Sequence, residues 1–184
     1  MKNIRGIFIT LVVVYVVTAI LNDKFLGGYN QSKQLERTGL YGILSLGVAF
    51  VIITRGIDLS IGSVVCLVGC GVPWLVVRHG WSPASAVSLG LLVGFLIGLF
   101  HGLLITKLKL QPFVVTLCGL LIYRGATRGL TDDQSQGFGS GFKEFREWGT
   151  GEIELVGKFS LPYPFLILVA LSIAAWIFLR KTIW

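Results

Sequence analysis

About six long apolar runs, separated by short polar segments, limit what this chain can fold into. Hydrophobic residues make up 54% of the 184 residues and charged residues only 14%, which is more apolar than a soluble domain of this size needs to fill one core. The sequence therefore predicts an all-α polytopic membrane protein with one transmembrane domain over residues 1–184. The runs are residues 6–21, 39–53, 61–77, 84–106, 113–123 and 161–179.

A charged motif, Arg55-Gly-Ile-Asp-Leu-Ser-Ile-Gly-Ser63, lies directly between the second and third runs. A lone charge at the bilayer centre costs on the order of 3 kcal/mol, so such residues usually face protein or a watery interior. Asp58 fits two roles that can hold together. It can cap the third helix by accepting from the amide of Ser60 or Ile61, or it can line a polar pathway where two helices break. Arg55 either screens Asp58 or marks the cytoplasmic end of the second run. The pathway or helix-break residues are thus Arg55, Gly56, Ile57, Asp58, Leu59 and Ser60.

The fourth run carries a glycine at every fourth position. Residues four apart share one face of a helix, so this helix presents a face without side chains. Each glycine costs about 1 kcal/mol relative to alanine in a helix, and close approach of another backbone offsets that cost in lipid. We predict that this face packs against another helix and favour a helix of the same subunit. The packing glycines are Gly90, Gly94, Gly98 and Gly102.

The fifth run is short, because only residues 113–123 precede Arg124. It is either re-entrant or extended beyond Arg124 in a polar interior. Gln111-Pro112 opens it, and proline suits a first helical turn. His101, in the fourth run, has no acidic residue or second histidine at helical spacing, so we expect a hydrogen-bonded residue between helices rather than a ligand or a base.

Basic residues of the short loops favour a cytoplasmic N-terminus, because alternation of six runs then places most of them inside. The first run lacks a small-residue cleavage site followed by a soluble domain, so we interpret it as a retained helix or anchor. This orientation places residues 124–160 outside the cytoplasm. The inside residues are Lys2, Arg5, Arg55, Lys107, Lys109, Arg180 and Lys181.

Residues 124–160 mix acidic residues, basic residues and glycines. We predict an extracytoplasmic surface loop that is partly ordered at best. It is either a solvated connector or a surface on which a partner docks. Its charged residues are Asp132, Asp133, Glu144, Glu147, Glu152 and Glu154, and Arg124, Arg128, Lys143, Arg146 and Lys158.

Several common signatures are missing from the sequence. Cys66, Cys70 and Cys118 show no metal-ligand spacing and are interpreted as small packing residues without disulfides. No GxxxxGK[ST], HExxH or GxSxG pattern occurs, so we predict no enzyme activity, no cofactor and no metal. The net charge of +7 comes from residues scattered at the ends of runs, which argues against a nucleic-acid partner.

Three stretches of the chain resemble the membrane-spanning permease subunits of bacterial ABC importers for monosaccharides, typified by the ribose permease. The first is the motif from Arg55 to Ser63, which follows an apolar run containing Gly47. The second is TLCGLLIYRGAT, residues 116–127, and the third is Lys-Thr at 181–182. Of these, Gly-Ile-Asp-Leu-Ser in its position is the specific signal. The resemblance is collinear over nearly the whole chain.

The resemblance implies a subunit of an ATP-driven monosaccharide uptake transporter in the bacterial plasma membrane. It implies as partners a second permease subunit, in a homodimer or heterodimer, a cytoplasmic ATP-binding subunit and an extracytoplasmic sugar-binding protein, in addition to membrane lipid. In that family the loop that contacts the ATPase would follow Trp184. The chain is therefore expected to be the N-terminal part of a permease, an incomplete bundle that stops before the coupling loop.

Two other classes of protein fit a glycine-rich helical membrane chain. A secondary transporter or channel subunit would need an inverted repeat or a pair of ion-coupling carboxylates, and Asp58 has no counterpart in the sequence. A membrane scaffold that transports nothing is the other. Copurification with an ATPase subunit would separate these classes.

Overall fold

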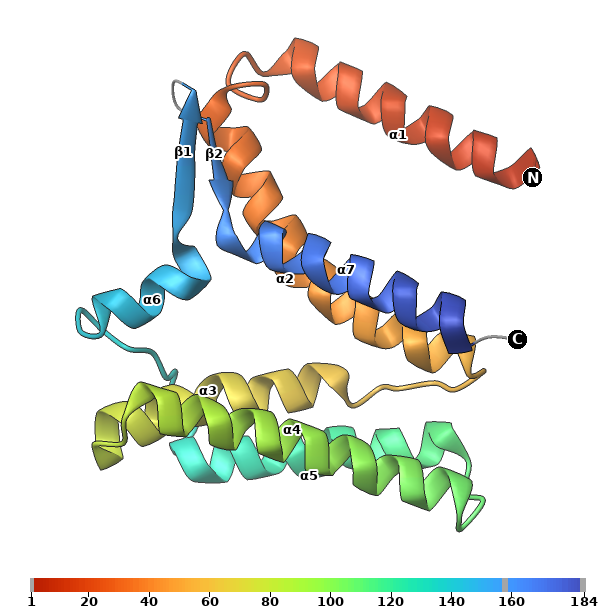
Figure 1. The fold of residues 1–184 in the computed structure, drawn as a ribbon, viewed down its shortest axis with the longest axis vertical. Helices are drawn as coiled ribbons and strands as arrows, with labels where there is room; N and C mark the ends of the chain where they lie inside the picture. Colours follow the sequence, from red (N-terminus) through yellow and green to blue (C-terminus); the bar gives the residue numbers. More distant parts are fainter. Residues whose placement is uncertain (1, 157–158, 183–184) are drawn as a thin grey trace. The chain divides into compact units, whose positions relative to one another are not determined.

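Seven helices and one β-hairpin make up the residues that the computed structural model describes, 2–156 and 159–182 (Figure 1). Five helices are long and apolar enough to cross a membrane, and α1 is apolar over a shorter stretch, Gly6–Leu21. This confirms the all-α, multi-pass membrane fold. The elements are α1 (Lys2–Leu21), α2 (Gly28–Ile53), α3 (Ile61–His79), α4 (Pro83–Thr106), α5 (Pro112–Thr131), α6 (Lys143–Thr150), β1 (Glu152–Val156), β2 (Phe159–Pro162) and α7 (Tyr163–Thr182).

Local signals in the sequence set several helix ends. Helix α3 ends at Gly80, which adopts a left-handed conformation with φ +68° and donates its N–H to the carbonyl of Leu75. Helix α4 begins after Ser82, whose Oγ accepts from the amide of Ser85 at 3.2 Å. Pro112 lies in the first turn of α5, as predicted.

Helix α5 resolves the ambiguity of the fifth run, because it continues through Arg124 to Thr131. The hydroxyls of Thr127 and Thr131 are buried and donate to carbonyls one turn earlier, at 2.8 and 2.9 Å. These bonds satisfy polar side chains without an outside partner. The structure thus moves the start of the predicted loop from Arg124 to Asp132.

The segment after Asp132 contains secondary structure that the sequence did not indicate. It contains α6 and an antiparallel hairpin in which Glu152 pairs with Pro162 and Glu154 with Ser160. The sequence did not predict this hairpin, because backbone pairing between β1 and β2 leaves no pattern as strong as an apolar run. Lys158, one of the charged residues predicted for the loop, lies outside the described residues.

Helix α2 begins eleven positions before the apolar run predicted for it, at Gly28 instead of residue 39. A contact with the distant hairpin explains the added polar turns. The Oγ of Ser32, which is 1% exposed, accepts from the amide of Ser160 at 2.8 Å and donates to the carbonyl of Gly28. Lys33 and Glu36 form an ion pair of 2.7 Å on the same turns.

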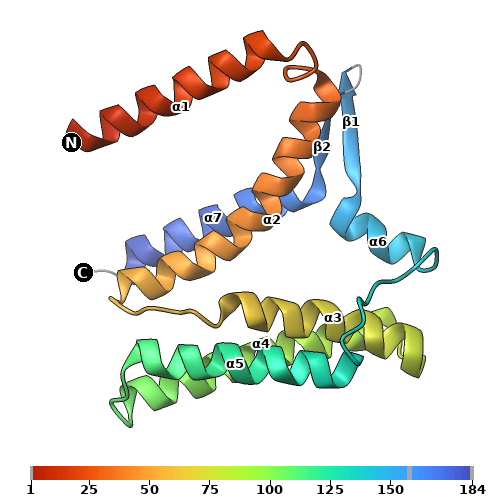
Figure 2. The same ribbon diagram turned by 180° about the vertical axis from the view of Figure 1, so that it is seen from behind.

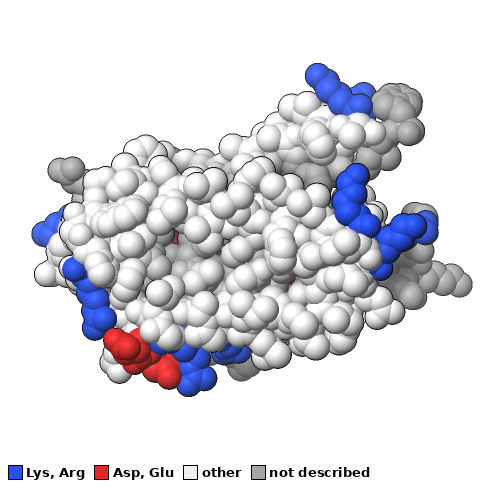
Figure 3. Space-filling model, turned by 90° about the horizontal axis from the view of Figure 1, so that it is seen from below, with Lys and Arg blue, Asp and Glu red and all other residues white. Residues whose placement is uncertain are grey.

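The described residues divide into two compact units. Unit 2, residues 44–145, is continuous in sequence and contains α3, α4 and α5, which lie alongside one another (Figure 2). Helix α3 packs on both α4 and α5, and Val72, Val76 and Ala86 form the buried centre. The face drawn in Figure 3 is largely free of charged side chains, as expected for helices that contact lipid.

Unit 1 combines the two ends of the chain, up to Ile43 and from Arg146 onward. Two of its helices pack closely at Gly39 on α2, where an added Cβ would lie 2.5 Å from the backbone of Pro164 and Phe165 on α7. One turn later, Gly42 faces the side chain of Leu168. These two glycines allow α2 and α7 to approach closely in this unit.

Candidate functional site

The predicted motif forms the non-helical connection between α2 and α3. Helix α2 ends at Ile53, Arg55 adopts a left-handed φ of +60°, and the amide of Gly56 returns to the carbonyl of Val51 at 2.9 Å. A Cβ at Gly56 would lie 3.0 Å from the Val51 side chain and 3.2 Å from its carbonyl oxygen. Glycine therefore lets the chain turn tightly against the end of α2.

Asp58 organises the start of α3. Its Oδ1 accepts from both the amide and the hydroxyl of Ser60, each at 2.7 Å. The amide contact is the one predicted from the sequence. Ser60 is 1% exposed and stands at the N-cap position, but its hydroxyl is directed to Asp58 and makes no bond to the amides of the first turn. Asp58 thus holds the cap residue in place. The carbonyl of Ser60 then accepts from the first helical amides, those of Ser63 and Val64.

Helix α5 holds the same segment from the other side. The buried Thr116 lies in the second turn of α5, and its Oγ1 lies 3.3 Å from the carbonyl oxygen of Ile57 as well as 2.8 Å from that of Pro112. Arg55, Ile57 and Leu59 remain exposed in the described chain. The break is therefore a fixed turn, tied to α3 by Asp58 and to α5 by Thr116.

A second polar contact joins α4 to α5 in the middle of unit 2. His101, 7% exposed, lies with Nε2 2.9 Å from the hydroxyl of Tyr123. Gly119 makes room for this pair, because a Cβ there would lie 2.8 Å from the imidazole. This confirms the interpretation of His101 as a hydrogen-bonded residue between helices.

Sequence reasoning did not select Tyr123 or Gly119 as partners of His101. The two residues occur on adjacent turns of one helix and His101 on another, and nothing in the linear pattern aligns the two helices. The spacing of Gly119 and Tyr123, four residues apart on one face, was the available signal.

Replacing Tyr123 by phenylalanine is expected to lower the stability of the whole chain by about 1–3 kcal/mol, because the buried imidazole of His101 loses its partner. Thermal unfolding in detergent micelles measures the loss. Tyr15→Phe is the matched control, since it removes an exposed hydroxyl contact of 3.3 Å to Gln31 and should change stability by less than about 0.5 kcal/mol. Equal losses in the two variants would contradict an interior role for the pair.

Of the four glycines on the predicted packing face of α4, Gly90 lies against another helix. A Cβ at Gly90 would lie 2.9 Å from Val68 and 3.1 Å from Val72, both on α3. Among the described residues, nothing lies within 4 Å of a Cβ placed at Gly94, Gly98 or Gly102. The packing partner for these three glycines therefore stays a prediction.

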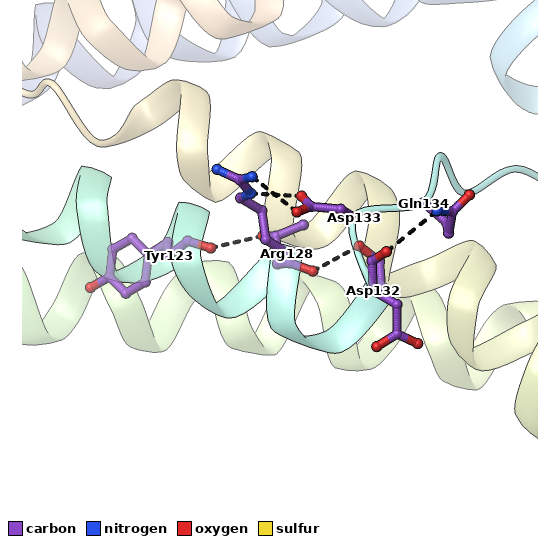
Figure 4. A network of polar contacts seen from close by, with 7 residues as sticks. Tyr123, Arg128, Asp132, Asp133 and Gln134 are labelled. Carbon is purple, nitrogen blue, oxygen red and sulfur yellow. Dashed lines mark hydrogen bonds and ion pairs between the residues drawn. The ribbon is translucent and has the colours of Figure 1, made fainter.

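Charged residues gather where α3 and α5 end (Figure 4). The guanidinium of Arg128 donates from Nε and Nη2 to the two carboxylate oxygens of Asp133, at 2.6 and 2.9 Å. This hydrogen-bonded cation holds the pKa of Asp133 below its ordinary value. Arg78, in the last turn of α3, lies 3.5 Å from Asp132. Solvent screens such exposed pairs, so they contribute little to stability, and they lie where α3 and α5 end.

No group of three or more potential metal ligands occurs among residues 2–156 and 159–182. The three cysteines are free thiols on α3 and α5.

Comparison with known proteins shows what the chain is similar to. Residues 30–184 match the family described as Branched-chain amino acid transport system / permease component. The ribose import permease protein RbsC of Bacillus subtilis (strain 168) is 34% identical over 178 residues, 96% of this chain and 53% of that protein.

Two other similar proteins have different sugars in their names. The xylose transport system permease protein XylH of Escherichia coli (strain K12) is 37% identical over 59% of the chain and 28% of that protein. The fructose import permease protein FrcC of Rhizobium meliloti is 29% identical over 90% and 46%. No solved structure matches significantly. The chain spans about half the length of the ribose permeases that it matches.

Proposed function

Because the chain belongs to the Branched-chain amino acid transport system / permease component family, we propose that it forms part of the membrane pathway of an ATP-driven importer of a monosaccharide. The observation that carries the proposal is the match to permeases named for ribose, xylose and fructose import. The five membrane-length helices agree with a multi-pass subunit of a bacterial plasma membrane. In this role the chain forms part of a transport pathway and does not itself catalyse a chemical reaction.

The partners of this proposal are a second permease subunit, a cytoplasmic ATP-binding subunit and an extracytoplasmic sugar-binding protein. ATP hydrolysis drives alternating access only if the ATP-binding subunit contacts two states of the permease differently. The charge bias predicts that segment 132–160 lies outside the cytoplasm, where it offers a surface for the sugar-binding protein. The face of Gly94, Gly98 and Gly102 offers a close approach for a further helix.

We assign the helix break from Arg55 to Ser60 to the translocation pathway. Its support is physical: a carboxylate held between two apolar helices needs a protein or water environment, and a broken helix exposes backbone dipoles that bind polar solutes. The carboxylate of Asp58 and, separately, the pair of Tyr123 and His101 supply acceptors and donors of the kind that hydroxyl-rich sugars bind.

The proposed function is tested by purifying a tagged chain from its host in mild detergent and measuring sugar uptake in the same strain. We expect an ATP-binding subunit to copurify, and deletion of the chain to abolish ATP-dependent uptake of ribose, xylose or fructose. Uptake driven by an ion gradient without an ATP-binding subunit would indicate a secondary transporter. A chain whose deletion leaves all uptake unchanged would be a scaffold.

Labelling of single cysteines checks the orientation. In a variant without the three native cysteines, Ser140→Cys should react with a membrane-impermeant maleimide in intact cells, because residue 140 is exposed in the predicted outer segment. Leu108→Cys, 64% exposed in the connection between α4 and α5, is the control and should react only after permeabilisation. The reverse pattern would invert the topology and exclude docking of an extracytoplasmic protein on this segment.

A further inference from the structure

The short helix α6 has one apolar and one polar face. Successive residues are 100° apart on a helix, so Phe145 and Trp148 share one face while Lys143, Arg146 and Glu147 lie on the other. The side chain of Trp148 is nevertheless 73% exposed. The described chain therefore leaves the indole on the apolar face of α6 uncovered.

The N-terminal half of α6 is fixed at the ends of α3 and α4. The ring of Phe145 lies 5.3 Å from that of Phe138, centre to centre. Phe138 in turn packs on the cluster of Val72, Val76 and Ala86. These residues belong to the last turns of α3 and the first turn of α4, next to the paired charges of Arg78 and Arg128 described above. Phe145 thus lies near the level at which these spans end.

The C-terminal end of α6 is fixed independently at the start of α7. The amide of Gly151 donates to the carbonyl of Glu147 at 2.7 Å, and its own carbonyl accepts from the amide of Tyr163 at 2.9 Å. A Cβ at Gly151 would lie 2.7 Å from the ring of Tyr163, the first residue of α7. This contact is within unit 1 and that of Phe145 within unit 2. Each unit by itself therefore places its end of α6 at the end of a membrane span.

We propose that α6 lies in the membrane interface, with Phe145 and Trp148 toward the acyl chains and Lys143 and Arg146 toward the headgroup phosphates. Tryptophan is enriched at this depth because its ring is apolar and its N–H is polar. Short helices with aromatic and basic faces bind there. Trp81, 43% exposed in the connection between α3 and α4, lies at the same end of those helices. The hairpin, joined to α6 through Gly151, is held beside the membrane surface as a result.

The proposal is tested with the full chain in vesicles of palmitoyl-oleoyl phosphatidylcholine and phosphatidylglycerol. Trp74, Trp81, Trp176 and Trp184 are replaced by phenylalanine, so that only the indole of Trp148 emits. Phosphatidylcholine brominated near the headgroup end of its acyl chain should reduce this emission about twofold, as expected for an interfacial indole.

The matched control moves the indole to the polar face by combining Trp148→Phe with Thr150→Trp, and we expect little quenching. As a second measurement, Trp148→Cys and Thr150→Cys in a cysteine-free chain carry an environment-sensitive fluorophore, so that loss of four tryptophans does not decide the outcome. Emission from position 148 should be blue-shifted relative to position 150. Equal quenching and equal emission at the two positions would overturn the proposal. So would an indole shielded only when a soluble partner protein is added, which would assign the face to protein docking.

Discussion

Leucine in place of Gly39 is expected to prevent α2 from packing on α7 and so to cause a large loss of stability in unit 1. The neighbouring atoms are the backbone of Pro164 and Phe165, 2.5 Å from an added Cβ. Backbone cannot move aside as a flexible side chain can, so the two helices must separate. We expect a loss of about 3 kcal/mol or more.

The matched control is Gly47→Leu on the same helix, because nothing among the described residues lies within 4 Å of a Cβ at this position. Yield of monodisperse protein and the thermal unfolding midpoint in detergent measure both variants. Gly39→Leu should unfold well below the parent and Gly47→Leu close to it. If the two variants had the same unfolding midpoint, the close crossing of α2 and α7 would be incorrect.

Leucine in place of Asp58 is expected to lower both stability and sugar uptake. The substitution removes two hydrogen bonds of 2.7 Å and leaves the buried hydroxyl of Ser60 without its acceptor. The expected cost is about 2 kcal/mol of folding stability, and uptake by the complete transporter should fall because the turn between α2 and α3 is no longer held. Thermal unfolding of the chain and uptake of labelled sugar measure the two effects.

Asparagine at the same position separates the two roles of Asp58. Asp58→Asn keeps an oxygen that accepts from Ser60 but removes the charge, so stability should stay within about 1 kcal/mol of the parent. If uptake nevertheless falls, the charge itself serves the pathway. If uptake and stability both match the parent, Asp58 only braces the start of α3 and the pathway assignment is wrong.

The membrane spans were predictable because each is a local property of the chain. Apolar length, Pro112 at the start of α5 and the glycine that ends α3 act on their own neighbours in sequence. The polar turns of α2 were not predictable, since Ser32 is satisfied by Ser160, which lies 128 positions away. The length of α5 has a different reason: its threonine hydroxyls bond within their own helix, which an apolar-length criterion does not register.

The candidate site was predictable only in part. The turn made by Asp58 and Ser60 is local, and the sequence indicated its amide contact. The pair of His101 and Tyr123 is formed by the alignment of two helices, which no residue encodes alone. Glycines show the same limit. A four-residue repeat selected α4, where Gly90 alone contacts α3 in the described chain, whereas the tight crossings at Gly39 and Gly119 occur at glycines that the repeat does not include.

The hydrogen bond between Ser32 and Ser160 also sets an order of events during synthesis. Unit 2 is continuous, whereas unit 1 needs both ends of the chain. A ribosome adds about 5–20 residues per second, so on the order of ten seconds separate the appearance of these two serines. The helices α3, α4 and α5 emerge within that interval and can assemble first. Until the hairpin and α7 have been synthesised, the polar turns of α2 and the backbone at Gly39 have not yet met their contacts. During this interval the nascent chain is most exposed to incorrect helix pairing or to binding by an insertion factor.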